Sequence, residues 1–350
     1  MKIAWITLLL LLSLFGLSYG QDTLTVMFYN LLNFPDGRDD CTPNTVIAGR
    51  YDTLRKIVQY VKPDMFLVCE LQNEKGADSI LNRSLNQFGN YQRANFVTNQ
   101  SGGPFLNNML FYNSTKVSLY SQDEIITDLR DVNRYIMYGN DPNLSAHNDT
   151  TFIDLYAAHL KAGSSPSDQT QRQIECDSIR SFVDAMPPGR NHILTGDLNL
   201  KTSNETAYQT LINTGTYPFN DPINSPGNWY NNSNFADIHT QSSRRTISMD
   251  CGALGGMNDR FDFILVTDNV LTGADRVQYL SNSYTNLGND GNHFNTSIIA
   301  SPLNLSAPDS VINALYYMSD HLPVFMKIII TYPPDTVLNS NFTTTLPSCP

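Results

Sequence analysis

The sequence predicts a single α/β domain that spans residues 21–333. Short apolar segments typical of strands alternate with longer amphipathic segments along this whole range. No linker rich in Pro, Gly or Ser interrupts the alternation, and no internal repeat is evident. With 350 residues and 41% hydrophobic content, the chain can bury one large core.

Residues 1–20 have the pattern of a cleaved secretory signal. A positive start is followed by the apolar run IAWITLLLLLSLFGL and by the small residues Ser18 and Gly20, directly before Gln21. A membrane anchor is the alternative, but the run is shorter than the roughly 20 residues that a bilayer span needs. We therefore expect a secreted or cell-surface protein without stable membrane association.

The predicted elements follow one another in a regular order. Strands are indicated by apolar runs such as TLTVMFYN and RFDFILV, and helices by apolar residues at helical spacing. Pro63 ends the first helix, and a Ser/Asp-rich start opens the second. Strands are predicted at 23–30, 62–71, 107–113, 134–139, 151–160, 191–200, 260–270 and 321–330, and helices at 45–61 and 165–186.

After the last predicted strand the composition changes. From Tyr332 onward the chain is rich in Pro, Thr, Ser and Asn, which predicts a tail or linker over residues 334–350. Within the domain, residues 238–260 contain several glycines and predict a substrate-facing loop.

Charge and cysteine content limit the function classes. The formal net charge of −11 argues against general attraction to nucleic acid or anionic lipid. It permits a phosphate substrate, because a bound divalent cation can supply local positive charge. Among the cysteines, Cys69 in MFLVC is expected to be a small buried hydrophobe. Cys41 and Cys251 lie in loop-like sequence, so an exported chain could pair them.

Polar side chains stand where the predicted strands end or begin. The ends of strands in an α/β sheet form a rim whose loops carry function. Carboxylates gathered there would repel one another unless a cation lay among them, and oxygen ligands from separate segments suit Mg²⁺. The residues at these positions are Asn30, Glu70, His159, Asp197, Asn199, Asp262, Asp320 and His321.

These segments resemble, in order, the motifs of the endonuclease/exonuclease/phosphatase superfamily. FYNLLNF is similar to its first-strand Asn motif, LVCEL to the metal-binding Glu segment and AAHLKAG to the His motif. TGDLNL is similar to the GDxN motif, RFDFIL to the strand with the orienting Asp, and SDHLPV to the closing SDH motif. One such motif alone is weak, but all six occur in the family's order along nearly the whole domain.

The resemblance implies both a fold and a reaction. The fold is a four-layer α/β sandwich, with two packed mixed β-sheets flanked by helices. The reaction is hydrolysis of a phosphate ester by water, assisted by a divalent metal. Mg²⁺ is the expected cofactor, with Mn²⁺ or Ca²⁺ as alternatives.

The resemblance also implies residue roles at the metal and at the phosphate. Glu70 and Asp320 are the expected metal ligands, with Asn30 in support and Asn33 as the competing choice. His321 donates to a phosphoryl oxygen or takes a proton from water. Asp262 orients its ring, because a carboxylate inside an apolar strand needs a partner. Each acid also has a purely structural interpretation. Asp320 is then a turn residue, Glu70 a carboxylate in solvent at a strand end, and Asp262 a buried acid whose hydrogen bonds are satisfied.

The remaining roles concern the attacking water and the substrate. Asp197 orients or deprotonates the water, and Asn199 donates to a phosphoryl oxygen; whether Asp197 or His321 is the general base stays open. His159 is expected at the phosphate. In pancreatic-type deoxyribonucleases the corresponding His has a Glu partner on an earlier strand, but NNMLFYN contains no acid. Arg130 and Lys161 are the expected substrate-binding residues, with Arg134 nearby.

We expect the substrate to be a phosphodiester, with nucleic acid as the first choice, and the protein to be a monomer. A local basic strip of Arg130, Arg134, Lys161, Arg244 and Arg245 would offset the acidic net charge. The alternatives are a phosphatase and a sphingomyelinase-like lipid phosphodiesterase. The latter should carry an exposed apolar hairpin, for which LYYM at 315–318 is a weak candidate. A non-catalytic binding protein is disfavoured, because the catalytic set is intact.

Overall fold

The computed structural model describes residues 20–37, 41, 49–104, 106–146, 149–246 and 250–333. The predicted tail and all of the predicted signal segment except Gly20 lie outside the described residues. So does the start of the helix predicted at 45–61, of which the structure describes α1 (Arg50–Val61).

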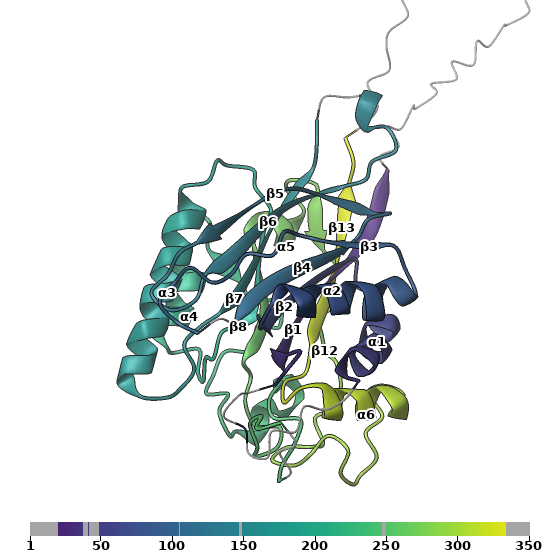
Figure 1. Cartoon of the computed structure of the whole chain (residues 1–350). Coiled ribbons are helices and arrows are strands. Elements are labelled where there is room, and N and C mark those ends of the chain that lie inside the picture. The colour runs from purple at the N-terminus through teal and green to yellow at the C-terminus, as the bar shows by residue number, and fades with distance from the viewer. Residues whose placement is uncertain are drawn as a thin grey trace, which may run out of the picture.

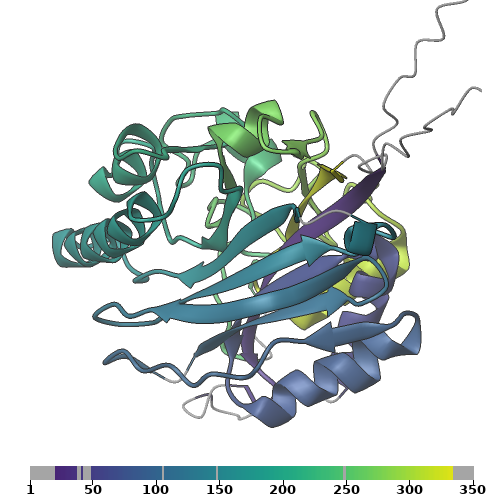
Figure 2. The ribbon, with the colours of Figure 1, turned by 90° about the horizontal axis from the view of Figure 1, so that it is seen from above.

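Two mixed β-sheets pack against each other, and helices cover their outer faces (Figures 1 and 2). The first sheet has the order β11 (Val277–Tyr279), β13 (Val324–Thr331), β1 (Gln21–Phe34), β2 (Met65–Leu71), β4 (Asn107–Asn113) and β3 (Tyr91–Arg93), with β12 (Thr285–Asn286) paired to β13. The second has the order β5 (Val117–Ile125), β6 (Val132–Gly139), β7 (Phe152–His159), β8 (His192–Asp197), β10 (Asp262–Thr267) and β9 (Phe219–Asn220). This arrangement confirms the predicted four-layer sandwich.

The helices divide between the two outer faces. α1 lies beside α6 (Asp309–Met318) along the first sheet, and α3 (Pro166–Asp184) lies beside α4 (Thr206–Asn213) along the second. α3 begins with a capping box between Ser165 and Asp168 and with a Pro at its first position, as predicted from its polar start. The shorter helices are α2 (Glu74–Ser79), η1 (Ile80–Ser84), η2 (Leu85–Gln87), η3 (Leu144–Ala146), η4 (Ser233–Ile238) and α5 (Asp268–Thr272).

Successive side chains along the strands of the second sheet point alternately into two hydrophobic cores. Ile193 and Ile264 point into the cluster shared with the first sheet, whereas Leu194 and Leu265 point into the cluster beneath α3 and α4. β2 is buried on both faces, because its cluster also contains apolar side chains of α1 and α6, and this explains the continuous apolar run MFLVC. Cys69 is fully buried in that run, as predicted.

Strand direction places several strand ends at one edge. β1 and β2 are parallel, as are β7 and β8, because α1 and α3 carry the chain back between them. β13 is antiparallel to β1, and β10 is antiparallel to β8. In each sheet, the carboxyl ends of two strands therefore lie beside the amino end of a third.

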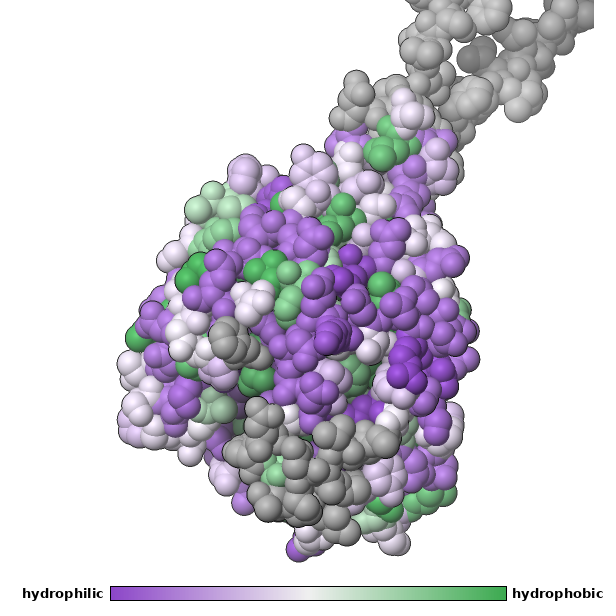
Figure 3. Space-filling view, in the orientation of Figure 1, coloured by the Kyte–Doolittle hydropathy of each residue, from purple (hydrophilic) through white to green (hydrophobic). Residues whose placement is uncertain are grey.

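Exposed apolar residues are few on the segments that the sequence singled out. The LYYM segment lies within α6, where Leu315, Tyr316 and Met318 are buried and only Tyr317 is exposed. It is therefore part of a helix packed on the core, so this weak candidate for an apolar hairpin is not one. No helix in the described part of the chain is long and apolar enough to cross a membrane. On the face shown in Figure 3, hydrophilic residues dominate and apolar residues form small separate patches.

A disulfide joins Cys41 to Cys251 across 210 residues, with a Cα–Cα distance of 5.5 Å. This confirms the pairing that their loop-like sequence suggested. Cys69 and Cys176 are free and buried. A bond that closes so long a loop restricts the unfolded chain strongly.

We predict that a Cys41→Ser, Cys251→Ser double variant loses about 2–4 kcal/mol of unfolding free energy, because the unfolded chain regains its freedom. Denaturant unfolding of the purified oxidised protein measures the difference. Cys176→Ala, which removes a buried free thiol, is the control for cysteine loss. An unchanged unfolding midpoint in the double variant would contradict the prediction.

Candidate active site

The strand ends enclose a polar cavity of about 260 Å³. Glu70 reaches it from β2, with Asn30 of β1 hydrogen-bonded to it, and His159 and Asp197 reach it from the ends of β7 and β8. Asp320 and His321 enter from the segment before β13. The cavity is lined by Leu32, Asn33, Glu70, His159, Ala162, Asp197, Asn199, Gln241, Cys251, Gly252, Ala253, Asp320 and His321.

The buried Asn30 amide connects the two sheets. Its Nδ2 donates to Glu70 Oε1 at 2.9 Å and to Asp197 Oδ2 at 3.0 Å, while its Oδ1 accepts from Leu32 N. Asn30 thus presents hydrogens, and not its oxygen, to the carboxylates. In this arrangement it orients Glu70 and Asp197, and its role as a direct metal ligand stays a prediction.

Glu70 is turned into the site by irregular backbone. Leu32, Asn33 and Glu70 all have left-handed φ angles, of 48°, 48° and 57°, and the β1–β2 register shifts between Asn30 and Phe34. Asn33 donates to Glu70 Oε2 from its backbone N and from its Nδ2, each at 3.0 Å. Asn30 and Asn33 therefore hold opposite oxygens of Glu70. Such strained positions are typical of functional sites.

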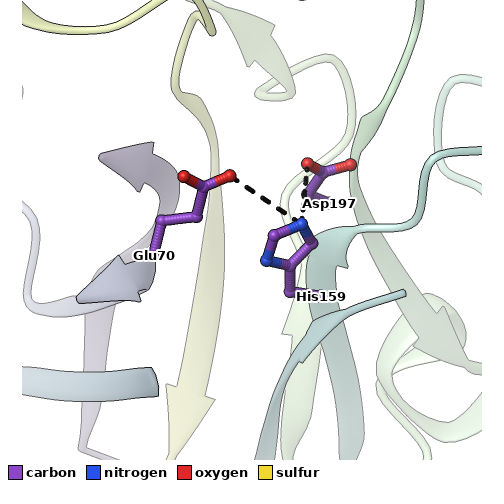
Figure 4. Close-up of side chains that lie close together, drawn as sticks. All are labelled: Glu70, His159 and Asp197. Carbon is purple, nitrogen blue, oxygen red and sulfur yellow. Dashed lines mark ion pairs between the residues drawn. The ribbon is translucent and has the colours of Figure 1, made fainter. Parts of the chain in front are cut away.

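Glu70, His159 and Asp197 form a cluster whose ligand atoms all lie within 4.8 Å of one another. His159 Nε2 lies 3.8 Å from Glu70 Oε1 and 3.6 Å from Asp197 Oδ2, and Figure 4 shows the ring pointing between the two carboxylates. Burial raises the pKa of Asp197 to about 7, and burial with the nearby Asp320 raises the pKa of Glu70. These shifts show that negative charge is costly here, so the donor set fits a divalent cation.

His159 is held in its neutral form by its surroundings. Burial lowers its pKa well below the ordinary value, and Arg130 and His321 add to the effect. Its Nδ1 is buried without a hydrogen-bond partner among the described residues. This agrees with the absence of an acid from β4, and in the tautomer protonated at Nδ1 the neutral ring offers an electron pair on Nε2 to the cluster.

His321 is paired with Asp262, as the sequence predicts. The two side chains meet through Nδ1 and Oδ2 at 2.8 Å, and Asp262 is fully buried at the start of β10. Burial lowers the pKa of His321, but Asp262 and Asp197 outweigh it, so the pKa lies well above the ordinary value. The pair fixes the ring so that Nε2 faces Asp197, at 3.6 Å from its Oδ2.

Gln241 is a site residue that the motifs did not identify. Its Nε2 lies 2.6 Å from His321 Nε2 and 3.3 Å from Asp320 Oδ2. Asp320 also accepts from Ala253 N at 2.6 Å. Both contacts come from the predicted substrate-facing loop at 238–260, so that loop does border the cavity. The Asp320 carboxylate therefore has protein partners in place, and metal binding by it stays a prediction.

Asn199 and Arg130 support the ends of β7 and β8. Asn199 has a φ of 51°, and its Nδ2 donates to Leu160 O at 3.1 Å. Arg130 is buried, and its Nη1 donates to the carbonyls of His159 and Leu160 at 2.7 and 2.9 Å. Arg130 thus brings positive charge behind His159, although direct contact with a substrate stays a prediction for both residues.

The predicted basic strip is not formed. Arg134 is paired with Asp154 and Asp123, and Lys161 with Asp168 at 2.8 Å. Arg244 is buried against Asp250, and only Arg245 is exposed. Arg134, Lys161 and Arg244 are each neutralised by carboxylates that the fold places beside them. Lys161 would have to leave Asp168 before it could hold a flanking phosphate.

The comparisons with known proteins agree with this geometry. The family model described as Endonuclease/Exonuclease/phosphatase family matches residues 27–321. A comparison of the sequence with curated proteins gives no match.

Solved structures of similar fold cover most of the chain. A family protein from Bacteroides thetaiotaomicron is 16% identical, with a TM-score of 0.56 over 89% of this chain and 99% of that one. D. rerio TDP2 complexed with a single-strand DNA product is 15% identical, with a TM-score of 0.55 over 87% and 98%. A B. thetaiotaomicron mannosyl-6-phosphatase is 14% identical, with a TM-score of 0.52 over 87% and 99%.

Behind the cavity, Glu175 of α3 is buried beneath the segment that follows β7. Its Oε2 accepts from Lys161 N at 2.9 Å, and its Oε1 has no hydrogen-bond partner among the described residues. Burial raises the pKa of Glu175 to about 7. The folded state therefore binds a proton that the unfolded state releases, between about pH 4.5 and pH 7.

We predict that this proton makes stability fall as pH rises through that window. From pH 5 to pH 8, the unfolding free energy of the wild-type protein should fall by on the order of 3 kcal/mol more than that of Glu175→Gln, because the amide has no charge to bury. Denaturant unfolding at a series of pH values measures it. Parallel pH profiles for the two proteins would show that Glu175 is not the titrating group.

Proposed function

The chain belongs to the endonuclease/exonuclease/phosphatase family and is therefore a phosphoesterase, and we propose that it is a secreted, divalent-metal-dependent phosphodiesterase that cuts nucleic acid. The observation that carries the proposal is the meeting of two sets of side chains at one small cavity. The Asp262–His321 pair presents an imidazole nitrogen there, and Glu70 and Asp197 supply carboxylates suited to a metal.

Each group has a task that its contacts support. With Nδ1 held by Asp262, His321 Nε2 is the only ring nitrogen able to reach a phosphoryl oxygen or a water. Asp197, oriented by Asn30, faces the same space and can position the attacking water. A divalent cation, held by Glu70 and Asp197 with His159 Nε2 within reach, would offset the negative charge of the phosphate.

The size of the cavity is compatible with a polymer substrate. Pockets that enclose a small ligand usually measure about 300–1,000 Å³. At about 260 Å³, this cavity accommodates a phosphate group and leaves the rest of a substrate on the surface. The fold of D. rerio TDP2, which is complexed with a single-strand DNA product, is compatible with such a substrate.

Export is supported by two independent features. Residues 1–20 have the composition of a signal peptide. The Cys41–Cys251 disulfide suits an oxidising compartment, since such bonds are rare where thiols are kept reduced.

A phosphatase is the main alternative, because a mannosyl-6-phosphatase shares the fold. A lipid phosphodiesterase is a weaker one. Its remaining support is the exposure of Leu303 and Leu305 in the segment before α6. Both alternatives use the same cavity, so substrate preference must separate them.

A hydrolysis panel tests the proposal. Plasmid DNA, RNA, sphingomyelin and small phosphomonoesters are each incubated with Mg²⁺, Mn²⁺ or Ca²⁺, and with excess EDTA. We expect cutting of DNA or RNA that EDTA abolishes, because the clustered carboxylates need a cation. Full hydrolysis in EDTA would contradict metal dependence. Fast monoester turnover without cutting of nucleic acid would establish the phosphatase instead.

We predict that Asp262→Asn lowers turnover by at least about 10²-fold, because the amide cannot stabilise the imidazolium of His321. His321→Ala is the reference variant and should lose at least as much. Apparent metal affinity, measured by activity against metal concentration, should stay within a few-fold of wild type. A large loss of metal affinity in Asp262→Asn would place this residue at the metal and not behind His321.

A further inference from the structure

We propose that Lys201 and Tyr230 form a binding subsite beside the catalytic cavity for the nucleotide next to the scissile phosphate. In this subsite the Tyr230 ring stacks on the base and the Lys201 ammonium contacts the neighbouring phosphate. The inference rests on the proposed nuclease function and assigns to it a specific substrate contact.

The backbone holds both residues at the rim of the site. Lys201 follows Asn199, which lines the cavity, by two positions. Its carbonyl accepts from Trp229 N at 2.9 Å and from Tyr230 N at 3.1 Å. Its own N–H donates to Glu205 Oε1 at 2.8 Å. The fully buried Trp229 anchors the second segment, so Lys201 and Tyr230 stay side by side.

A single aromatic ring separates this pair from the catalytic histidine. The Lys201 Nζ atom lies 5.6 Å from the centre of the Phe261 ring, and that ring lies 6.4 Å from the ring of His321. Phe261 is nearly buried. Its ring therefore lies close to both His321 and the Lys201 side chain, which places Lys201 within reach of a substrate chain that leaves the cavity on this side.

The Lys201 ammonium is available to an anion. Among the described residues it is paired with Asp259 Oδ1 at 3.9 Å, a long ion pair beyond hydrogen-bond distance, and the Lys201 side chain is 24% exposed. This contrasts with Lys161, whose ammonium is 2.8 Å from a carboxylate oxygen. In a chain with a net charge of −11, the only carboxylate paired with Lys201 among the described residues is thus held at long range, and a phosphate can take its place by a direct contact.

Tyr230 supplies the second half of the subsite. Its side chain is 47% exposed, and Lys201 Nζ lies 3.9 Å from the ring centre, over one face. The exposed part of the ring can stack on a base, as aromatic side chains do in proteins that bind single-stranded nucleic acid. A cation and an exposed ring together match a nucleotide better than a sugar phosphate, which has no aromatic group.

Kinetics on two substrates test the subsite. The first is a single-stranded oligonucleotide of about ten residues, and the second is methyl p-nitrophenyl phosphate, a diester without a base. With the oligonucleotide, Tyr230→Ala should raise KM about tenfold at nearly constant kcat, the scale of one stacked base. Lys201→Ala should also raise KM and reduce the log–log salt slope of binding by about one. Neither variant should change kcat/KM for the small diester.

Conservative and distant variants serve as controls. Tyr230→Phe and Lys201→Arg should keep most of the oligonucleotide affinity, because they retain the ring and the charge. Tyr60→Ala and Lys56→Ala, on α1, remove an equally exposed tyrosine and an exposed lysine from another part of the surface and should have no effect.

The outcomes distinguish failure of this subsite from failure of the proposed function. If wild-type protein cuts nucleic acid and the variants match it, the subsite is refuted while the nuclease stands. If Tyr230→Ala and Lys201→Ala lose activity equally on both substrates, their role is structural and the subsite is again refuted. If wild-type protein cuts no nucleic acid, both the nuclease and its nucleotide subsite are overturned.

Discussion

One buried amide fixes the geometry on which the rest of the site depends. Asn30 belongs to the first sheet, yet its Nδ2 donates both to Glu70 of that sheet and to Asp197 of the second. Its oxygen and its carbonyl are themselves held, by Leu32 N and by the Ser319 hydroxyl. Two carboxylates that would otherwise repel each other are thus kept at one spacing. The folded protein can therefore present both carboxylates to a cation without a conformational change that brings them together.

Much of this arrangement could be predicted from the sequence, because strand direction is a strong constraint. Polar residues at the ends of parallel strands, and at the starts of strands antiparallel to them, must meet at one edge. This places Glu70, Asp197 and the Asp262–His321 pair together without knowledge of any loop. The burial of Cys69 follows from its apolar neighbours in the same way.

The sequence is less informative wherever a loop decides the outcome. Gln241 reaches His321 only because the two residues pair in an isolated antiparallel bridge, and no local pattern encodes that pairing. The pairing of Lys161 with Asp168 depends likewise on how the chain turns from β7 into α3. A lysine next to a motif therefore predicts a charge near the site, but not which group that charge contacts.

The loop over Asp320 also links the site to the disulfide. Cys251 lines the cavity and is bonded to Cys41, and Ala253 N, two residues later, donates to the Asp320 carboxylate. Between them, a Cβ on Gly252 would lie 2.8 Å from Leu32 Cδ2 and 3.1 Å from Asp320 Cβ, so a larger residue here would have to displace these side chains. The segment that orients Asp320 is thus held by a covalent bond on one side and by tight packing on the other. Because the bond forms only where thiols oxidise, the compartment of the protein and the geometry of its site are physically connected.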